Sequence, residues 1–183
     1  MMDSINEMRV INKSTKWRIG LILICWLSML GFDFFLHAGL LAKLYVRPSS
    51  FLLPVEEAFL RIPFGYLSFL ILAIVLVWIM ERLNINKWQK GFWFGLKFGA
   101  LLWGSFALGL YSISTIEMGL LFGWCIGQTL ELGIAGMVAG AGIFGKSFRV
   151  LLKWVILFVV IMIIVTIILQ SFGFAPPMGQ VGG

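Results

Sequence analysis

The sequence predicts an all-α protein, a polytopic bundle of five membrane-spanning helices in a single domain. Apolar residues make up 61% of the 183 residues and charged residues 12%, whereas soluble domains are nearer half apolar and a quarter charged. The mean hydropathy is +1.02. Five apolar runs, separated by short polar segments, are each long enough to cross a hydrocarbon core of about 30 Å.

The five predicted spans are joined by short connections and cover residues 17–41, 63–80, 91–112, 118–144 and 154–170. Residues 46–61 are expected to form an interfacial loop or a short surface helix. Pro54 can begin such a helix, and Glu56 and Glu57 would be favourable in its first turn. The tail after Ser171 is rich in Gly and Pro, so we expect it to be poorly ordered.

The distribution of positive charge predicts the orientation. Eleven of the 14 Lys and Arg residues fall on the side of the N-terminus, and only Lys43, Arg47 and Arg61 fall on the other. Because cytoplasmic segments carry an excess of Lys and Arg, the N-terminus is predicted to be cytoplasmic and the C-terminus external. The net charge of +6 therefore reflects topology in a multi-pass protein of the inner or plasma membrane, and does not indicate nucleic-acid binding.

Small residues recur at every fourth position in the third and fourth spans. Residues spaced in this way share one helix face, and small residues let helix backbones approach closely in a membrane. The pattern is a glycine zipper and predicts close helix packing, with a pore lined by backbone as the alternative. The predicted packing residues are Gly91, Gly95, Gly99, Gly119, Gly123, Gly127, Gly136 and Gly140.

Glu131 interrupts the small-residue face near the middle of the fourth span, where an ionised carboxylate is costly. Gln128 precedes it by three residues, and counting residues places Lys97 of the antiparallel third span within reach. Glu131 could handle a proton or a cation. It could instead be structural, either as an ion pair or as a protonated acid hydrogen-bonded inside the bundle. Replacing a paired Glu131 by Leu would leave Lys97 and Gln128 unpaired and lower the stability.

Asp33 and His37 are four residues apart in the first span and therefore share a face. A carboxylate can fix the tautomer of an imidazole and raise its pKa. The pair suits a proton relay or substrate site, two ligands of a metal, or local structural pairing. We expect no metal site and no cofactor, because the chain has one histidine and because Cys25 and Cys125 are too deep or on the wrong side.

The polar residues suggest how the spans are arranged. Spans one, three and four are expected to form a polar centre, with Asp33 and Glu131 facing one shared interior. Spans two and five should lie outside it. Span five is dominated by Val and Ile and has no glycine, which indicates a helix that faces lipid without a packing seam.

Enzyme signatures are missing from the sequence. There is no G-x-S-x-G, H-E-x-x-H, P-loop or G-x-G-x-x-G motif. We therefore interpret the chain as a small integral membrane protein of binding or accessory type, in the lipid bilayer alone, as a homo-oligomer or in a larger membrane assembly. A small proton-coupled transporter or carrier is the alternative, and a membrane-embedded enzyme acting on lipid is the third class.

Two segments resemble those of known proteins. Phe34 to Lys43 ends the first span with aromatic, glycine and lysine residues, and Gly123-Trp124 is followed by small residues through Gly140. Together they resemble a family of small bacterial and archaeal integral membrane proteins with four or five spans and no known function. The resemblance implies a helical bundle in an inner membrane, and it implies no activity.

Overall fold

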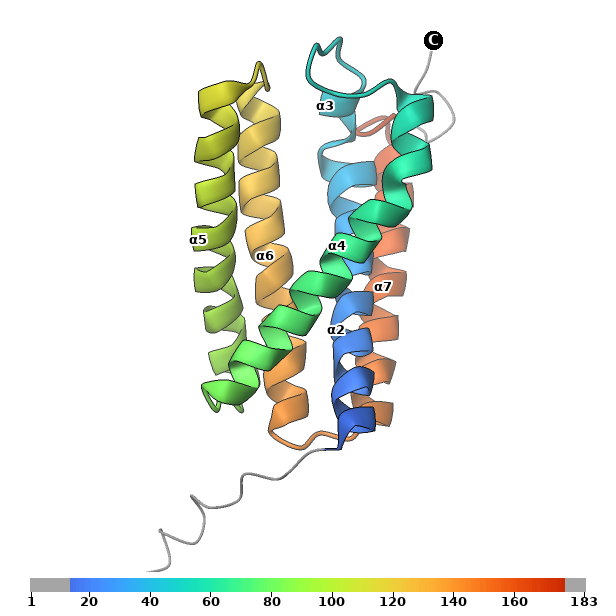
Figure 1. Ribbon diagram of the computed structural model, residues 1–183. Helices are drawn as coiled ribbons and strands as arrows, with labels where there is room; N and C mark the ends of the chain where they lie inside the picture. The colour runs from blue at the N-terminus through green and yellow to red at the C-terminus, as the bar shows by residue number, and fades with distance from the viewer. Residues whose placement is uncertain (1–13, 177–183) are drawn as a thin grey trace, which may run out of the picture.

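The computed structural model describes residues 14–176, which form helices and no strands (Figure 1). Five helical segments are long and apolar enough to cross a membrane, which confirms the predicted all-α bundle of five spans. The elements are α2 (Thr15–Phe35), its π-helical extension η1 (Leu36–Leu40), the short α3 (Ala42–Tyr45), α4 (Val55–Arg82), α5 (Trp88–Ile113), α6 (Met118–Ile143) and α7 (Phe148–Ser171).

Helix α4 begins earlier than expected. It is continuous from Val55, so residues 55–61 belong to the second spanning helix and not to a separate surface segment. Pro54 caps its start, as the sequence suggested. Pro63 lies inside the helix without ending it, because a proline there removes only one backbone hydrogen bond, which the rest of a long apolar helix can offset.

Helix α7 is also longer than predicted. It begins at Phe148, where the Ser147 hydroxyl accepts a backbone N–H of the first turn. After the helix, the chain folds back so that the N–H groups of Phe174 and Ala175 donate to the carbonyl of Leu169. Ala175 is 1% exposed, so residues 172–176 are ordered, contrary to our expectation. Residues 177–183 lie outside the described range.

Helix α2 is the centre of the bundle. It packs along α7, α6 and α4, whereas α5 packs extensively only on α6 (Figure 1). The first and fourth spans are therefore central, as expected, but the prediction for the third span is wrong: α5 lies at the edge. The short connection from α5 to α6 keeps these two helices together, and it does not bring α5 to α2.

Helix α7 has a packing seam, which the sequence did not predict. Gly31 of α2 lies against Val159, and Gly20 of α2 lies against Phe148. The small residues of this contact are on α2, so the Val- and Ile-rich sequence of α7 carries no sign of it. The face of α7 turned away from α2 is exposed.

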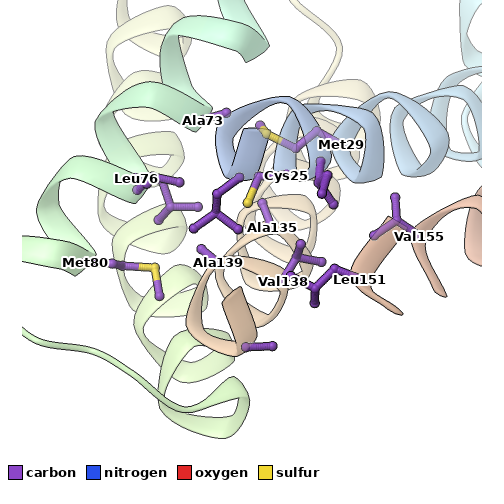
Figure 2. Packing of buried hydrophobic residues seen from close by; sticks show 14 of the residues in the cluster. Cys25, Met29, Ala73, Leu76, Met80, Ala135, Val138, Ala139, Leu151 and Val155 are labelled. Atoms are coloured by element: carbon purple, nitrogen blue, oxygen red, sulfur yellow. The ribbon is translucent and has the colours of Figure 1, made fainter. Parts of the chain in front are cut away.

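The largest hydrophobic core lies towards the end of the bundle where α2 begins, which is the lower end in Figure 1. Four helices contribute to it, and Figure 2 shows their side chains meeting. Only smaller clusters of buried residues form near the opposite, upper end. The labelled core residues are Cys25, Met29, Ala73, Leu76, Met80, Ala135, Val138, Ala139, Leu151 and Val155.

Glycines bring α5 and α6 into backbone contact. A Cβ built on Gly95 would overlap the carbonyl oxygen of Leu132, and one on Gly91 would overlap that of Gly136. The same close approach recurs at Gly99 and at Gly140. Because no side chain separates the backbones, dispersion contacts between them are as dense as helix geometry allows.

The glycines at the start of α6 face other neighbours. Gly123 lies against the side chain of Leu41 and Gly127 against that of Leu36, so both turn towards η1 and the residue after it. Gly119 is exposed, and a Cβ added there would meet only the neighbouring Glu117 side chain. No helix among the described residues packs on Gly119, contrary to the sequence pattern.

Ion pairs join elements at both ends of the bundle. Arg18 and Glu81 lie 3.0 Å apart at the lower end, and Arg47 and Glu117 lie 2.5 Å apart at the upper end. The cytoplasmic location of the lower end stays a prediction from charge. Arg9 and Lys13, which contribute to it, lie outside the described residues.

Candidate functional site

The site is built around η1, a π-helical turn that follows directly on α2. Its defining hydrogen bond runs from the N–H of Leu41 to the carbonyl of Leu36, at 2.8 Å. The carbonyl of Ala38, within the turn, accepts a hydrogen bond from the Gln170 side chain of α7 at 3.0 Å. Single π turns are rare and occur frequently at functional sites, and this one carries His37.

A cluster of polar side chains from three elements surrounds His37. Its Nε2 lies 3.1 Å from Asp33 Oδ1, and Gln128 Nε2 of α6 lies 3.5 Å from the same oxygen and 3.4 Å from His37 Nε2. On the other side of the ring, His37 Nδ1 is hydrogen-bonded to the Tyr45 hydroxyl of α3. That hydroxyl also accepts a hydrogen bond of 2.5 Å from Trp124 Nε1.

One of these hydrogen bonds has a fixed direction. The indole of Trp124 can only donate, so the Tyr45 oxygen is the acceptor there, and its own O–H can donate to His37 Nδ1. In the tautomer that accepts at Nδ1, the imidazole hydrogen lies on Nε2 and faces Asp33. Asp33 Oδ1 then faces donors from both His37 and Gln128, an arrangement that suits a carboxylate.

Tyr45 lies outside the spanning segments. Burial raises the pKa of its phenol well above the usual value. The hydrogen bond from Trp124 lowers that pKa, and the negative charge of Asp33 raises it further. The hydroxyl consequently keeps its hydrogen throughout the physiological range and remains able to donate it.

A cavity of about 710 Å³ adjoins the cluster in the upper half of the bundle. It lies between α2 with η1, α3, the connecting segment before α4, and the first half of α4. Aromatic and aliphatic residues dominate its wall, which contains no Ser, Thr or Cys among the described residues. The lining residues are Asp33, Phe34, His37, Ala38, Ala42, Tyr45, Phe51, Leu52, Leu53, Ala58, Phe59, Ile62, Gly65, Tyr66, Phe69 and Pro176.

The cavity exists because α4 crosses the bundle obliquely (Figure 1). Core residues from the lower half of α4 pack together with those of α2 and α6, while the cavity separates its upper half from α2. Trp26 of α2 donates to the carbonyl of Tyr66 at 2.8 Å, which fixes α4 where the two helices separate. Above that point, the segment between α3 and α4 is tied to the α5–α6 connection by Ser50 and Thr115, at 2.8 Å, in addition to the ion pair of Arg47.

Glu131 is fully buried but does not line this cavity. Neither of its carboxylate oxygens has a hydrogen-bond partner among the described residues. The pairing with Lys97 or Gln128 considered from the sequence is absent from this part of the chain. Lys97 is exposed on α5, which packs on a different face of α6, and the Gln128 amide is directed to Asp33 and His37.

The structure thus brings together Asp33, His37 and Gln128 from two helices and leaves Lys97 apart. Sequence reasoning did not identify Tyr45 and Trp124 as members of this cluster. Trp124 precedes Gln128 by four residues, and that spacing places both on one face of α6. Nothing in helical periodicity places Tyr45 against His37, because a π turn lies between them.

The structure places no further metal-ligating side chain with Asp33 and His37 among the described residues. Within residues 14–176, no group of three or more His, Cys, Asp or Glu side chains could hold a metal ion. Both cysteines are free, with Cys25 buried in the lower core and Cys125 half-buried on α6.

Comparison with known proteins adds no relative. No family model, curated protein or solved structure matches the chain. The resemblance to small bacterial and archaeal membrane proteins stays an expectation based on two short segments. The cavity and its polar wall are therefore the basis of the functional proposal.

Proposed function

We propose that this integral membrane protein binds an amphiphilic molecule in the cavity beside His37, as a binding or accessory protein. The observation that carries the proposal is an apolar cavity with one hydrogen-bonded polar cluster in its wall. Ligand sites typically have volumes of about 300–1,000 Å³ and place a few polar groups in an apolar surface. The cavity, at about 710 Å³, fits that description.

The polar cluster is accessible from the cavity. The side chains of Asp33 and His37 are 13% and 30% exposed, and both residues line the cavity. An apolar ligand body would contact the phenylalanines of α4 and of the preceding segment. A polar head group would reach the carboxylate and imidazole, whose hydrogen bonds to Tyr45 and Gln128 hold them in place.

The composition of the wall favours binding over nucleophilic catalysis. An Asp–His pair that activates a hydrolase needs a hydroxyl or thiol nucleophile beside the imidazole, and the described wall offers no Ser, Thr or Cys. The imidazole nitrogen not facing Asp33 is engaged by Tyr45, whose hydroxyl is held by Trp124. An accessory role in a larger assembly or a homo-oligomer stays a prediction.

A proton-coupled carrier is the second candidate. Asp33 and Glu131 lie at membrane depth, and neither has a Lys or Arg partner among the described residues. Histidine is the side chain whose charge ordinarily changes nearest neutral pH, and His37 contacts Asp33. A carrier also needs access from the opposite side. A smaller cavity of about 280 Å³ lies at the lower end beside Lys87 and Ala141, and no described polar chain links it to His37.

Photoaffinity labelling would test the proposed binding site. The full chain in liposomes would be irradiated with a long-chain alcohol that carries a diazirine in its chain. We expect saturable labelling, mapped by mass spectrometry to residues 34–45 and 51–69. Gly65 lines the cavity and has no atom within 4 Å of its Cβ position, so Gly65→Phe should fill the cavity without a clash and abolish this labelling.

Gly104→Phe is the matched control. Gly104 on α5 also has open space at its Cβ position and does not line the cavity, so this variant should label like the wild type. Labelling spread over the lipid-exposed faces of α5 and α7, and equal in all three proteins, would refute the proposed function.

A further inference from the structure

One oxygen of Asp33 is left open in the wall of the cavity. Its Oδ1 faces His37 and Gln128. The described part of the chain gives Oδ2 no hydrogen-bond or ion-pair partner. This oxygen is not sealed in protein either, since it is absent from the buried atoms that lack a partner. Asp33 therefore presents a free acceptor to whatever occupies the cavity.

The negative charge of Asp33 has no fixed counterion among the described residues. No Lys or Arg of residues 14–176 lies within ion-pair distance of it. The other titratable groups that face Asp33 are Tyr45 of α3, Tyr66 of α4 and Glu131 of α6, none of which can be positive.

The remaining helices do not change this balance. The upper half of helix α7 has no charged side chain, and its Gln170 amide is bonded to the carbonyl of Ala38. An unpaired charge at the centre of a membrane is unfavourable. A positive charge must therefore come either from a proton on the cluster or from a ligand in the cavity.

The aromatic residues that line the cavity with Asp33 suit an organic cation. Six aromatic residues line the cavity: Phe34, Tyr45, Phe51, Phe59, Tyr66 and Phe69. Aromatic faces attract cations, and they do so more strongly when water is excluded. A small hydrated ion would lose its water without gaining enough oxygen ligands, whereas a cation surrounded by apolar groups would match both the carboxylate and the rings.

We propose that the cavity selects lipophilic cations, held by Asp33 and the aromatic wall. This inference rests on the proposed function for its cavity and adds the charge of the ligand. A cation would neutralise Asp33, whereas an uncharged ligand of the same shape would gain only the apolar contacts of the wall.

Equilibrium dialysis of tritiated tetraphenylphosphonium against the purified full chain in an uncharged detergent would test this. We expect saturable binding by the wild type. Asp33→Asn should weaken binding at least about tenfold, while Asp33→Glu should retain it. Gly104→Phe should match the wild type.

Two results would overturn the inference. One is equal binding by the wild type and Asp33→Asn when both elute as the same monodisperse species. The other is displacement of the cation by uncharged tetraphenylmethane as effectively as by unlabelled tetraphenylphosphonium. The diazirine alcohol separates this failure from that of the proposed function: an uncharged probe that still labels the cavity leaves the binding site standing and removes only the selectivity for cations.

Discussion

The contact between α5 and α6 and the contact between α2 and α4 show two opposite ways of joining helices. Gly91, Gly95 and Gly136 let the backbones of α5 and α6 touch where residues 87–99 meet residues 129–140. Helix α4 joins α2 through core residues such as Ala73 and Leu76 and through the hydrogen bond from Trp26 to Tyr66. In the upper half, aromatic side chains line the space between the helices, and a cavity remains.

The difference indicates which helix contact stabilises the bundle and which one leaves room for a ligand. Lipid solvates apolar helices as well as protein does, so helices associate in a membrane where their surfaces fit closely. The α5–α6 contact provides that fit through glycines rather than charged groups. The α2–α4 contact lacks this close fit at its upper end, where the π turn and the polar cluster of His37 lie.

The largest expected effect is at the glycine contact. Gly95→Ala would drive its methyl group into the carbonyl of Leu132, and backbone atoms cannot rotate away. We expect a loss of about 3 kcal/mol in the free energy of unfolding, measured as the midpoint of SDS unfolding in mixed micelles. Gly104→Ala on the same helix meets no atom and should be stabilising by about 0.5 kcal/mol. Equal midpoints for the two variants would contradict the close backbone contact.

Glu131 sharpens the comparison, because it is a buried polar group on α6 outside both the glycine contact and the cavity. Sequence alone predicts that Glu131→Leu destabilises by leaving Lys97 and Gln128 unpaired. The structure reverses the sign, since neither residue is its partner. We expect Glu131→Leu to raise the free energy of unfolding by about 2 kcal/mol, the cost of a buried polar group without a partner.

Glu131→Gln is the matched control for that measurement. It keeps a polar group without a partner and should change stability by less than the Leu variant. A loss of stability in Glu131→Leu would mean that the carboxyl group has a partner in the folded protein. The shared interior of Asp33 and Glu131 would gain support from that result, and the lack of a partner would be disproved.

Gly127 tests whether the nature of the contacting atoms matters. A methyl group at Gly127 meets the end of the Leu36 side chain, which can rotate, unlike the backbone at Gly95. Gly127→Ala should therefore cost only about 1 kcal/mol by the same SDS titration. A cost as large as that of Gly95→Ala would show that η1 is as rigid as the α5–α6 contact.

The smallest effect is expected at the upper end, where Arg47 and Glu117 are about half exposed. Exposed ion pairs contribute about 0–1 kcal/mol, so Arg47→Gln should leave the unfolding midpoint nearly unchanged. It should nevertheless speed labelling of the cavity by the diazirine alcohol. The segment between α3 and α4 would then be held to the α5–α6 connection only by the hydrogen bond between Ser50 and Thr115. Unchanged labelling kinetics would show that the segment does not limit access.

The sequence predicted the fold well, because apolar length and glycine spacing are properties of single helices. It placed Asp33, His37 and Gln128 correctly as polar groups inside spans. It could not show that they converge, because that depends on the angle at which α2 and α6 meet. It misplaced Lys97 for the same reason: depth along the membrane can be counted from a sequence, whereas direction around a helix bundle depends on its neighbours.

The cavity itself was beyond sequence reasoning. The sequence predicted a surface segment for residues 46–61, because charged and aromatic side chains are mixed there. In the structure, the first part is the loop between α3 and α4, and residues 55–61 begin α4. The oblique crossing of α4 is a property of packing, set by Leu76 and Met80 at one end and by Trp26 at its hydrogen bond to Tyr66. No periodicity in residues 55–82 reports it.

The π turn makes the polar cluster depend on the number of residues as well as on their identity. A regular helix advances by about 100° for each residue, and η1 accommodates an additional residue within its turn. Deleting Leu40, which is exposed, would restore an ordinary helix and rotate Tyr45 by about 100° away from His37. A single lost codon would thus disconnect Trp124 and Tyr45 from the imidazole while every side chain of the cluster remained in the protein.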